Sequence, residues 1–148
     1  MTMATAEAAE FIECPVAEAF LLLSQPDKHP LWQTDLESDG IIDGNGGVGS
    51  RGRESRRFMG RLVITEYEVT EFVEPQRWGM RSITGPLSMA ATLSCAPSGT
   101  GTTVTISMSF GGWSGEAMAR FAKQQFKTHL RTLKSLAEAG RRAAEPRT

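Results

Sequence analysis

The sequence predicts an α+β fold in which a seven-stranded antiparallel sheet curves around one long C-terminal helix. Three observations predict it: a long amphipathic segment closes the chain, a run of short strand-like segments precedes that segment, and two short helical pieces separate the first strand from the others. A sheet with a single long helix must bury one face against that helix. A strongly curved sheet is hard to fill completely, so we expect a cavity between the sheet and the helix.

The N-terminal part of the chain begins with a strand over residues 6–14. Pro15 suits the first turn of a helix, and the apolar residues that follow it recur at helical spacing. Pro26 ends this helix, and residues 27–32 form a second short helical turn. The two short helices therefore lie between the first and second strands.

The middle of the chain has the pattern of a β-sheet, with Gly, Pro, Asn and Ser at each break. Because the links between successive segments are short, the strands form hairpins and the sheet is antiparallel. The Gly-rich stretch 44–49 lacks the Gly-Lys-Ser/Thr of a phosphate-binding loop, which favours a tight hairpin over an anion site. The predicted strands span residues 36–43, 49–59, 61–74, 77–84, 87–96 and 102–111.

The closing helix is predicted over residues 114–139, with Ser114 as its N-cap and Glu116 in its first turn. Basic residues follow one side of this helix and apolar residues the other. Two polar residues, Gln125 and His129, project near the centre of the apolar side. A buried polar group without a partner costs roughly 1–3 kcal/mol. Either protein neighbours satisfy the pair, or the helix closes over a space that holds water or ligand.

The space under this helix is the predicted ligand-binding site. We expect its wall to include Met118, Phe121, Ala122, Gln125 and His129. Phe126 lies toward the edge of the apolar stripe, where it could pack outside the cavity. His129 has three open roles: a residue facing ligand or water, a structurally satisfied core residue, or, least favoured, a general acid/base.

Arginines alternate along the third predicted strand: Arg51, Arg53 and Arg57 share one face, and Arg56 points the other way. We interpret the three as a solvated face, paired with Glu66, Glu68 and Glu71 of the next strand, rather than as a ligand-facing cationic stripe. Cys14 precedes a helix start, where the helix dipole could lower its thiol pKa, but a buried small residue is favoured.

The composition excludes several classes of function. The chain has 148 residues and a net charge of −1, which suits a single domain and argues against a general nucleic-acid binder. No stretch approaches the roughly 20 apolar residues of a membrane helix, and the N-terminus lacks a secretion signal, so we expect a cytoplasmic protein. Two histidines and two cysteines are widely scattered, so no metal and no cofactor are expected.

We expect one domain over residues 1–148, with an ordered core at about 6–139 and a flexible tail at 141–148. The sequence leaves open whether the protein forms a homodimer. Both cysteines are expected to be reduced thiols.

Several short motifs occur in a characteristic order: Ile12-Glu13-Cys14-Pro15-Val16-Ala17-Glu18-Ala19-Phe20, Pro26-Asp27-Lys28-His29-Pro30-Leu31-Trp32, Val48-Gly49-Ser50-Arg51-Gly52-Arg53, Tyr67-Glu68-Val69 with Phe72-Val73-Glu74-Pro75, and Gly101-Thr102-Thr103-Val104-Thr105. In this order they resemble the START-like, or SRPBCC, superfamily, and most closely its polyketide cyclase/dehydrase-type branch. The resemblance covers residues 6–139 and implies a helix-grip fold with a mostly apolar cavity. Members of the superfamily bind lipids, steroids, polyketides or plant hormones, and some cyclise or aromatise polyketides.

Two classes of function follow from the predicted cavity and the resemblance. The first is binding of a small apolar, ring-bearing metabolite by a soluble carrier or sensor. The second is an enzyme of the cyclase/aromatase or dehydratase type that folds a reactive chain in the same cavity. A weaker third is a protein-interaction module. The sequence contains no identifiable catalytic constellation, and the superfamily has no universal catalytic motif, so these alternatives stay open.

Overall fold

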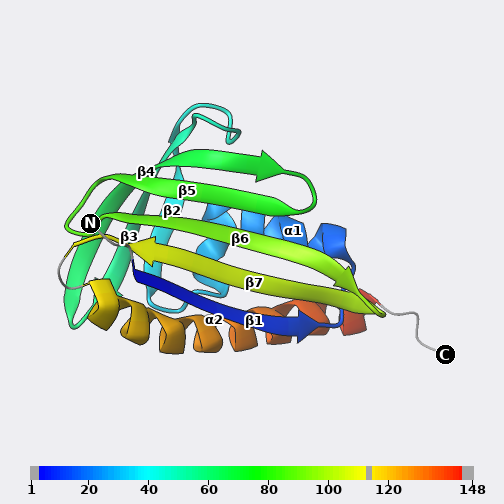
Figure 1. Cartoon of the computed structure of the whole chain (residues 1–148). Helices are drawn as coiled ribbons and strands as arrows, with labels where there is room; N and C mark the ends of the chain where they lie inside the picture. The colour runs from blue at the N-terminus through cyan, green and yellow to red at the C-terminus, as the bar shows by residue number, and fades with distance from the viewer. Residues whose placement is uncertain (1–3, 113–114, 145–148) are drawn as a thin grey trace.

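The computed structural model describes residues 4–112 and 115–144. It confirms the predicted fold: seven antiparallel strands, one long C-terminal helix, and two short helices between the first two strands (Figure 1). The elements in chain order are β1 (Ala4–Ile12), α1 (Val16–Ser24), the 3-10 helix η1 (Pro26–Leu31), β2 (Leu36–Asp43), β3 (Arg51–Phe58), β4 (Arg61–Val73), β5 (Arg77–Thr84), β6 (Met89–Ser98), β7 (Gly101–Phe110) and α2 (Gly115–Ala144).

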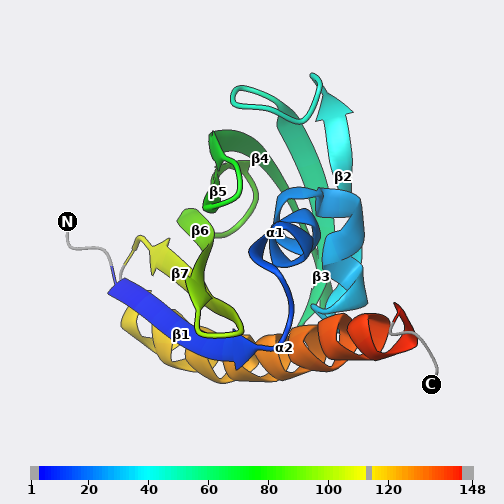
Figure 2. The ribbon, with the colours of Figure 1, turned by 90° about the vertical axis from the view of Figure 1, so that its right-hand side faces the viewer.

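The strands form one sheet in the order β1-β7-β6-β5-β4-β3-β2. Strands β2 to β7 pair in chain order, whereas β1 pairs with β7, from Ala4 opposite Phe110 to Ile12 opposite Thr102. Register shifts in the β2–β3 and β4–β5 pairs mark β-bulges, which increase the bend of a sheet. Figure 2 shows the resulting curve, from β1 beside α2 round to β3 and β2, with α1 and η1 closing one end.

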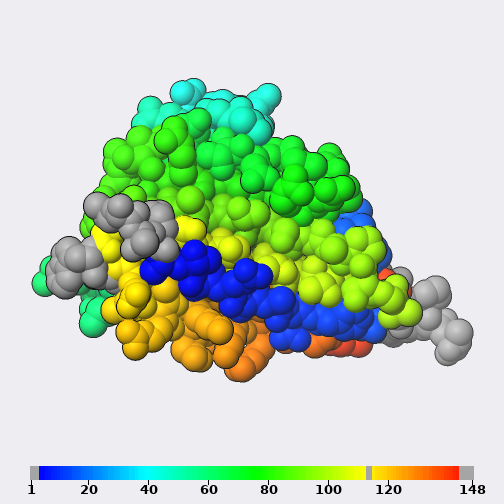
Figure 3. Space-filling view, viewed as in Figure 1, coloured from blue at the N-terminus to red at the C-terminus, as the bar shows by residue number. Residues whose placement is uncertain are grey.

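Helix α2 packs along β1 and β7. Figure 3 shows the atoms of β1 directly against those of α2. Leu130 of the helix is only 1% exposed. At the rim, Lys134 Nζ donates to the Phe11 carbonyl at 3.0 Å, and Glu138 accepts from the Glu13 amide at 3.0 Å. The C-terminal half of α2 is therefore fastened to the edge strand by apolar packing and by polar contacts.

Element boundaries differ from the prediction by a few residues. Strand β1 begins two residues early, because Ala4 and Thr5 already pair with Phe110 and Ser109 of β7. It also ends two residues early, because the Cys14 amide donates to the Ile12 carbonyl at 2.9 Å in the turn before α1. Residues 141–144, expected in a flexible tail, continue α2. The predicted N-cap Ser114 lies outside the described residues, and so do residues 145–148 of the expected tail. Among the helices of residues 4–112 and 115–144, none is long and apolar enough to cross a membrane.

The Gly-rich stretch joins β2 to β3 as the predicted hairpin. Gly44, Gly46 and Gly49 adopt φ values of 99°, 96° and 91°, a conformation that glycine reaches more readily than other residues. A strand follows the loop, whereas a phosphate-binding loop opens a helix.

Candidate functional site

A cavity of about 110 Å³ lies between the inner face of the sheet and α2. Helix α2 contributes all five of the predicted lining residues, Met118, Phe121, Ala122, Gln125 and His129. That they bind a ligand stays a prediction. Phe126 is 6% exposed and also lines the cavity, so the expectation that it could pack outside the cavity was wrong. The sheet supplies a mainly apolar wall that includes Met80, Met89, Ala91, Leu93, Ile106 and Phe110.

Two phenylalanines stand where the cavity meets solvent. Phe58, at the end of β3, and Phe121 of α2 pack edge to face with ring centroids 5.2 Å apart. Both line the cavity, yet Phe121 is 42% exposed. This aromatic pair therefore contributes to the part of the cavity wall that reaches solvent.

The first polar group on the wall joins α2 to the loop before β2. His129 is 2% exposed, and its Nε2 lies 3.0 Å from Asp35 Oδ1. The approach of these two atoms is poorly aligned for a hydrogen bond from this nitrogen. Arg56 Nη1 donates to the same Asp35 oxygen at 2.7 Å, and Arg56 Nη2 donates to Gln33 Oε1 at 2.7 Å. Burial alone would raise the pKa of Asp35, but His129 and Arg56 outweigh burial and hold that pKa below its usual value.

The second polar group links η1 to the sheet. His29 Nε2 donates to the Leu23 carbonyl at 2.7 Å, because a carbonyl oxygen can only accept. His29 Nδ1 lies 2.9 Å from Asp39 Oδ2, and the Tyr67 hydroxyl donates to Asp39 Oδ1 at 2.6 Å. Burial, reinforced by the charge of Asp39, raises the pKa of Tyr67, so Tyr67 stays a protonated donor at neutral pH. This network holds the Asp39 carboxylate from two sides.

Two further polar side chains on the wall lack good partners among the described residues. Glu54 is 6% exposed, and its hydrogen bonds from Arg56 Nε and Nη2 are both 3.4 Å long. Trp78 is 3% exposed, and its indole N–H has no acceptor within the part of the chain that the structure describes. A buried donor without an acceptor is costly, so the cavity wall has unmet polar capacity.

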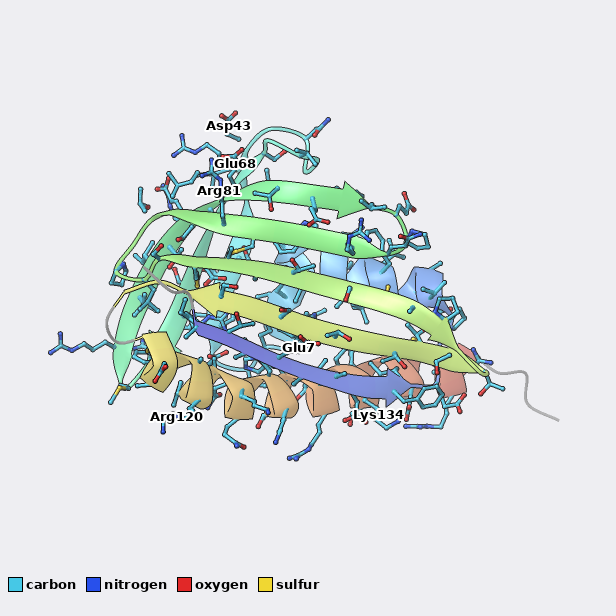
Figure 4. The ribbon with its side chains drawn as sticks, viewed as in Figure 1. Glu7, Asp43, Glu68, Arg81, Arg120 and Lys134 are labelled. Atoms are coloured by element: carbon cyan, nitrogen blue, oxygen red, sulfur yellow. The ribbon has the colours of Figure 1, made fainter. Side chains whose placement is uncertain are left out.

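The remaining arginines of β3 lie on the outer face, as expected, but their partners are only partly those predicted. Arg51 and Arg53 both pair with Glu66, at 3.2 and 3.0 Å. The prediction was wrong for the other glutamates. Glu68 pairs with Arg81, and these two side chains extend outward together in Figure 4, while Glu71 pairs with Arg77 and Arg57 pairs with Glu37. Arg56 alone turns inward, because it alternates with its neighbours along the strand.

Both cysteines are free and buried thiols, as expected. Burial raises the pKa of Cys14, so the alternative of a helix-activated thiolate is wrong. Burial likewise raises the pKa of Cys95 to about 11. In residues 4–112 and 115–144, no three His, Cys, Asp or Glu side chains come together as a metal site.

Sequence reasoning missed the sheet's share of the polar wall. A signal existed for Glu54 and Arg56, since both occupy the face of β3 opposite to the solvated arginines. No periodicity could have found Asp35, which lies in the loop before β2. Nothing in the sequence distinguishes Tyr67 and Trp78 from ordinary buried aromatic residues.

Comparisons with known proteins agree with this geometry. A search of curated protein sequences finds no significant match. A START superfamily protein from Mycobacterium smegmatis superposes with a TM-score of 0.80 at 14% identity, over 93% of this chain and 99% of that one. The protein TTHA0849 from Thermus thermophilus gives 0.78 at 19% identity over the same shares. Ginseng major latex-like protein 151, from Panax ginseng, gives 0.77 at 14% identity over 91% of this chain and 97% of that one.

At these identities the structural likeness establishes the fold alone. The sequence itself matches a protein family over residues 3–138, nearly the whole of the described chain. The family match supports a hydrophobic ligand-binding or polyketide cyclase-type role. The chain belongs to the family described as polyketide cyclase / dehydrase and lipid transport.

Proposed function

We propose that the protein binds a small, apolar, ring-bearing molecule in the cavity between the sheet and α2. The observation that carries this proposal is the cavity itself, whose wall is mainly aliphatic, thioether and aromatic and includes Met118, Ala122 and Phe126. Transfer of an apolar ring from water into such a space is favourable by roughly 25 cal/mol per Å² of buried apolar surface. Methionines on the wall adapt to ligands of different outline.

The volume of the cavity limits the size of the ligand. An apolar cavity of about 150 Å³ holds benzene. The 110 Å³ found in this protein is therefore on the scale of a single ring. A larger, fused-ring molecule requires Phe58 and Phe121 to move apart at the mouth.

Binding of toluene, followed by NMR or calorimetry, tests the proposal. Ala122→Phe places a ring inside the cavity and should abolish binding, because Ala122 is 7% exposed and lines the wall. Ala117→Phe is the matched control, since it makes the same change at an exposed position of α2. Native mass spectrometry of the purified protein would look for a natural ligand. Equal toluene binding by both variants would contradict the proposal.

A cyclase- or dehydratase-type reaction in the same cavity is the second candidate function. His129 beside Asp35 favours it, because an imidazole beside a carboxylate at the wall of a cavity is suited to accept and donate a proton. His129→Gln keeps a polar side chain but cannot titrate. If the protein turns over a poly-β-keto substrate, this variant should lose turnover while it keeps toluene binding. Full turnover in the variant would count against an acid/base role for His129.

A further inference from the structure

Glu54 is a buried carboxylate whose partner on the same strand, Arg56, makes its shorter hydrogen bonds to other residues. Arg56 lies two residues further along the same inward face, but its short hydrogen bonds, at 2.7 Å, go to Asp35 and Gln33. Its contacts with Glu54 are both 3.4 Å, beyond the usual 2.7–3.2 Å range of N–H···O hydrogen bonds. Glu54 therefore has free acceptor capacity on the cavity wall.

A second carboxylate, on the neighbouring strand, makes the environment of Glu54 still less favourable. Asp39 of β2 is the cross-strand partner of Glu54, and both line the cavity. Like charges directly opposite each other in a sheet are unfavourable. Asp39 has partners at 2.9 and 2.6 Å in His29 and Tyr67, whereas the donor to Glu54 among the described residues is Arg56, at 3.4 Å.

Trp78 provides an independent observation on the wall of the same cavity. Its ring packs edge to face against His29 and Tyr67, with centroid distances of 5.1 and 6.1 Å. Its buried indole N–H has no acceptor in residues 4–112 and 115–144, although buried indole groups usually find one. The cavity wall thus has an acceptor that lacks a good donor and a donor that lacks an acceptor.

We infer that the cavity selects single-ring molecules that carry a hydroxyl group, with the hydroxyl donating to Glu54, over rings without a polar group and over ring carboxylates. A hydroxyl both donates and accepts, so the same kind of group also suits the indole N–H of Trp78. This inference rests on the proposed function and names the ligand class of that cavity.

The charges on the wall explain why carboxylates are rejected. Asp35, Asp39 and Glu54 place three carboxylates on the wall, against the single guanidinium of Arg56 and the two histidines. Arg56 is already engaged by Asp35 at 2.7 Å and by Glu54 at 3.4 Å. A carboxylate ligand would face uncompensated negative charge in a poorly solvated space, whereas a neutral hydroxyl faces an acceptor.

Toluene, phenol and benzoate test the inference, with binding measured by calorimetry or NMR on the full chain at neutral pH. Phenol and toluene have the same number of heavy atoms, so they compare a hydroxyl with a methyl group at almost constant size. A dry, apolar cavity rejects phenol, because the hydroxyl loses its hydrogen bonds to water. We expect phenol to bind at least as tightly as toluene and benzoate to bind most weakly.

Glu54→Leu should weaken phenol binding at least tenfold, the effect of losing one hydrogen bond to a charged acceptor, and should leave toluene binding unchanged or tighter. Glu54→Gln, which keeps an acceptor without the charge, should give an intermediate loss. Glu66→Leu is the matched control on the outer face, where Glu66 pairs with Arg51 and Arg53, and should change neither affinity.

Each outcome in the wild-type protein decides a separate point. If toluene binds and phenol binds more weakly, the hydroxyl selectivity is wrong while the proposed function stands. If benzoate binds most tightly, the charge reasoning is wrong. If none of the three binds, the inference and the proposed function both fail. If a Glu54 variant does not fold, the order of the affinities of the wild-type protein for toluene, phenol and benzoate still tests the inferred selectivity.

Discussion

Replacing Tyr67 by Phe removes one buried hydroxyl and leaves the rest of the core intact. Tyr67 is fully buried, and its hydroxyl donates to Asp39 Oδ1 at 2.6 Å. A hydrogen bond to a charged acceptor contributes about 1.5–3 kcal/mol, and Phe fits the same space. Asp39 keeps His29 as its remaining partner. We therefore expect Tyr67→Phe to lower the free energy of unfolding by about 1.5–3 kcal/mol.

Urea unfolding followed by circular dichroism measures this loss. The midpoint should fall at an unchanged slope, because the variant exposes the same surface on unfolding. In thermal melts the loss corresponds to roughly 3–12 °C for a chain of this size. Thr5→Val is the control, since its exposed hydroxyl makes only a 3.4 Å contact with Ser109. If Tyr67→Phe melted within about 1 °C of wild type, the hydroxyl would contribute nothing and the reasoning would be refuted.

Three further perturbations probe the walls of the cavity. Gly52→Ala should lower the melting temperature well below that of Gly40→Ala, because a Cβ at Gly52 would overlap the Tyr67 ring whereas nothing lies within 4 Å at Gly40; equal melts would contradict this. His129→Leu removes the contact that helps to hold the pKa of Asp35 down, so the melting temperature of the ligand-free protein at neutral pH should fall, and binding of a hydrogen-bonding ligand should weaken by about 0.5–1.5 kcal/mol. An unchanged or higher melting temperature would show that the contact with Asp35 contributes no stability. The pKa of Asp35 is lowered in the folded state, so its ionised form stabilises the fold above the usual pKa of 3.8, and this stability is lost as pH falls through the folded-state pKa. The free energy of unfolding, measured with urea below about pH 4, should therefore fall less steeply with decreasing pH in Asp35→Asn than in wild type. The same dependence on pH in both proteins would contradict this.

The fold could be predicted because each element carries a local signal. Gly, Pro and Asn mark every break between the strands, and a period of 3.6 residues marks the closing helix. The ends were harder to place. β1 begins earlier than its weak strand formers suggest because its partner β7 imposes the pairing, and α2 runs beyond residue 139.

The candidate site was only half predictable. Helical periodicity placed Gln125 and His129 toward the cavity, since that face of a helix is set by local spacing. The part of the cavity wall that the sheet forms depends on which strands pair and where the β-bulges lie. Neither can be predicted from a local sequence pattern. The meeting of His129 with Asp35, which lie far apart in the chain, is a product of this long-range arrangement.

The pairing of β1 with β7 also constrains how the chain folds as it is synthesised. The first strand leaves the ribosome with unpaired backbone groups, and its partner is complete only when Phe110 has been added. Closing so long a loop costs entropy before any contact compensates for it, and such non-local pairing slows folding. During that interval the edge of the first strand is exposed to other chains. Its two glutamates, Glu7 and Glu10, put one charge on each face of the waiting strand, which discourages premature association.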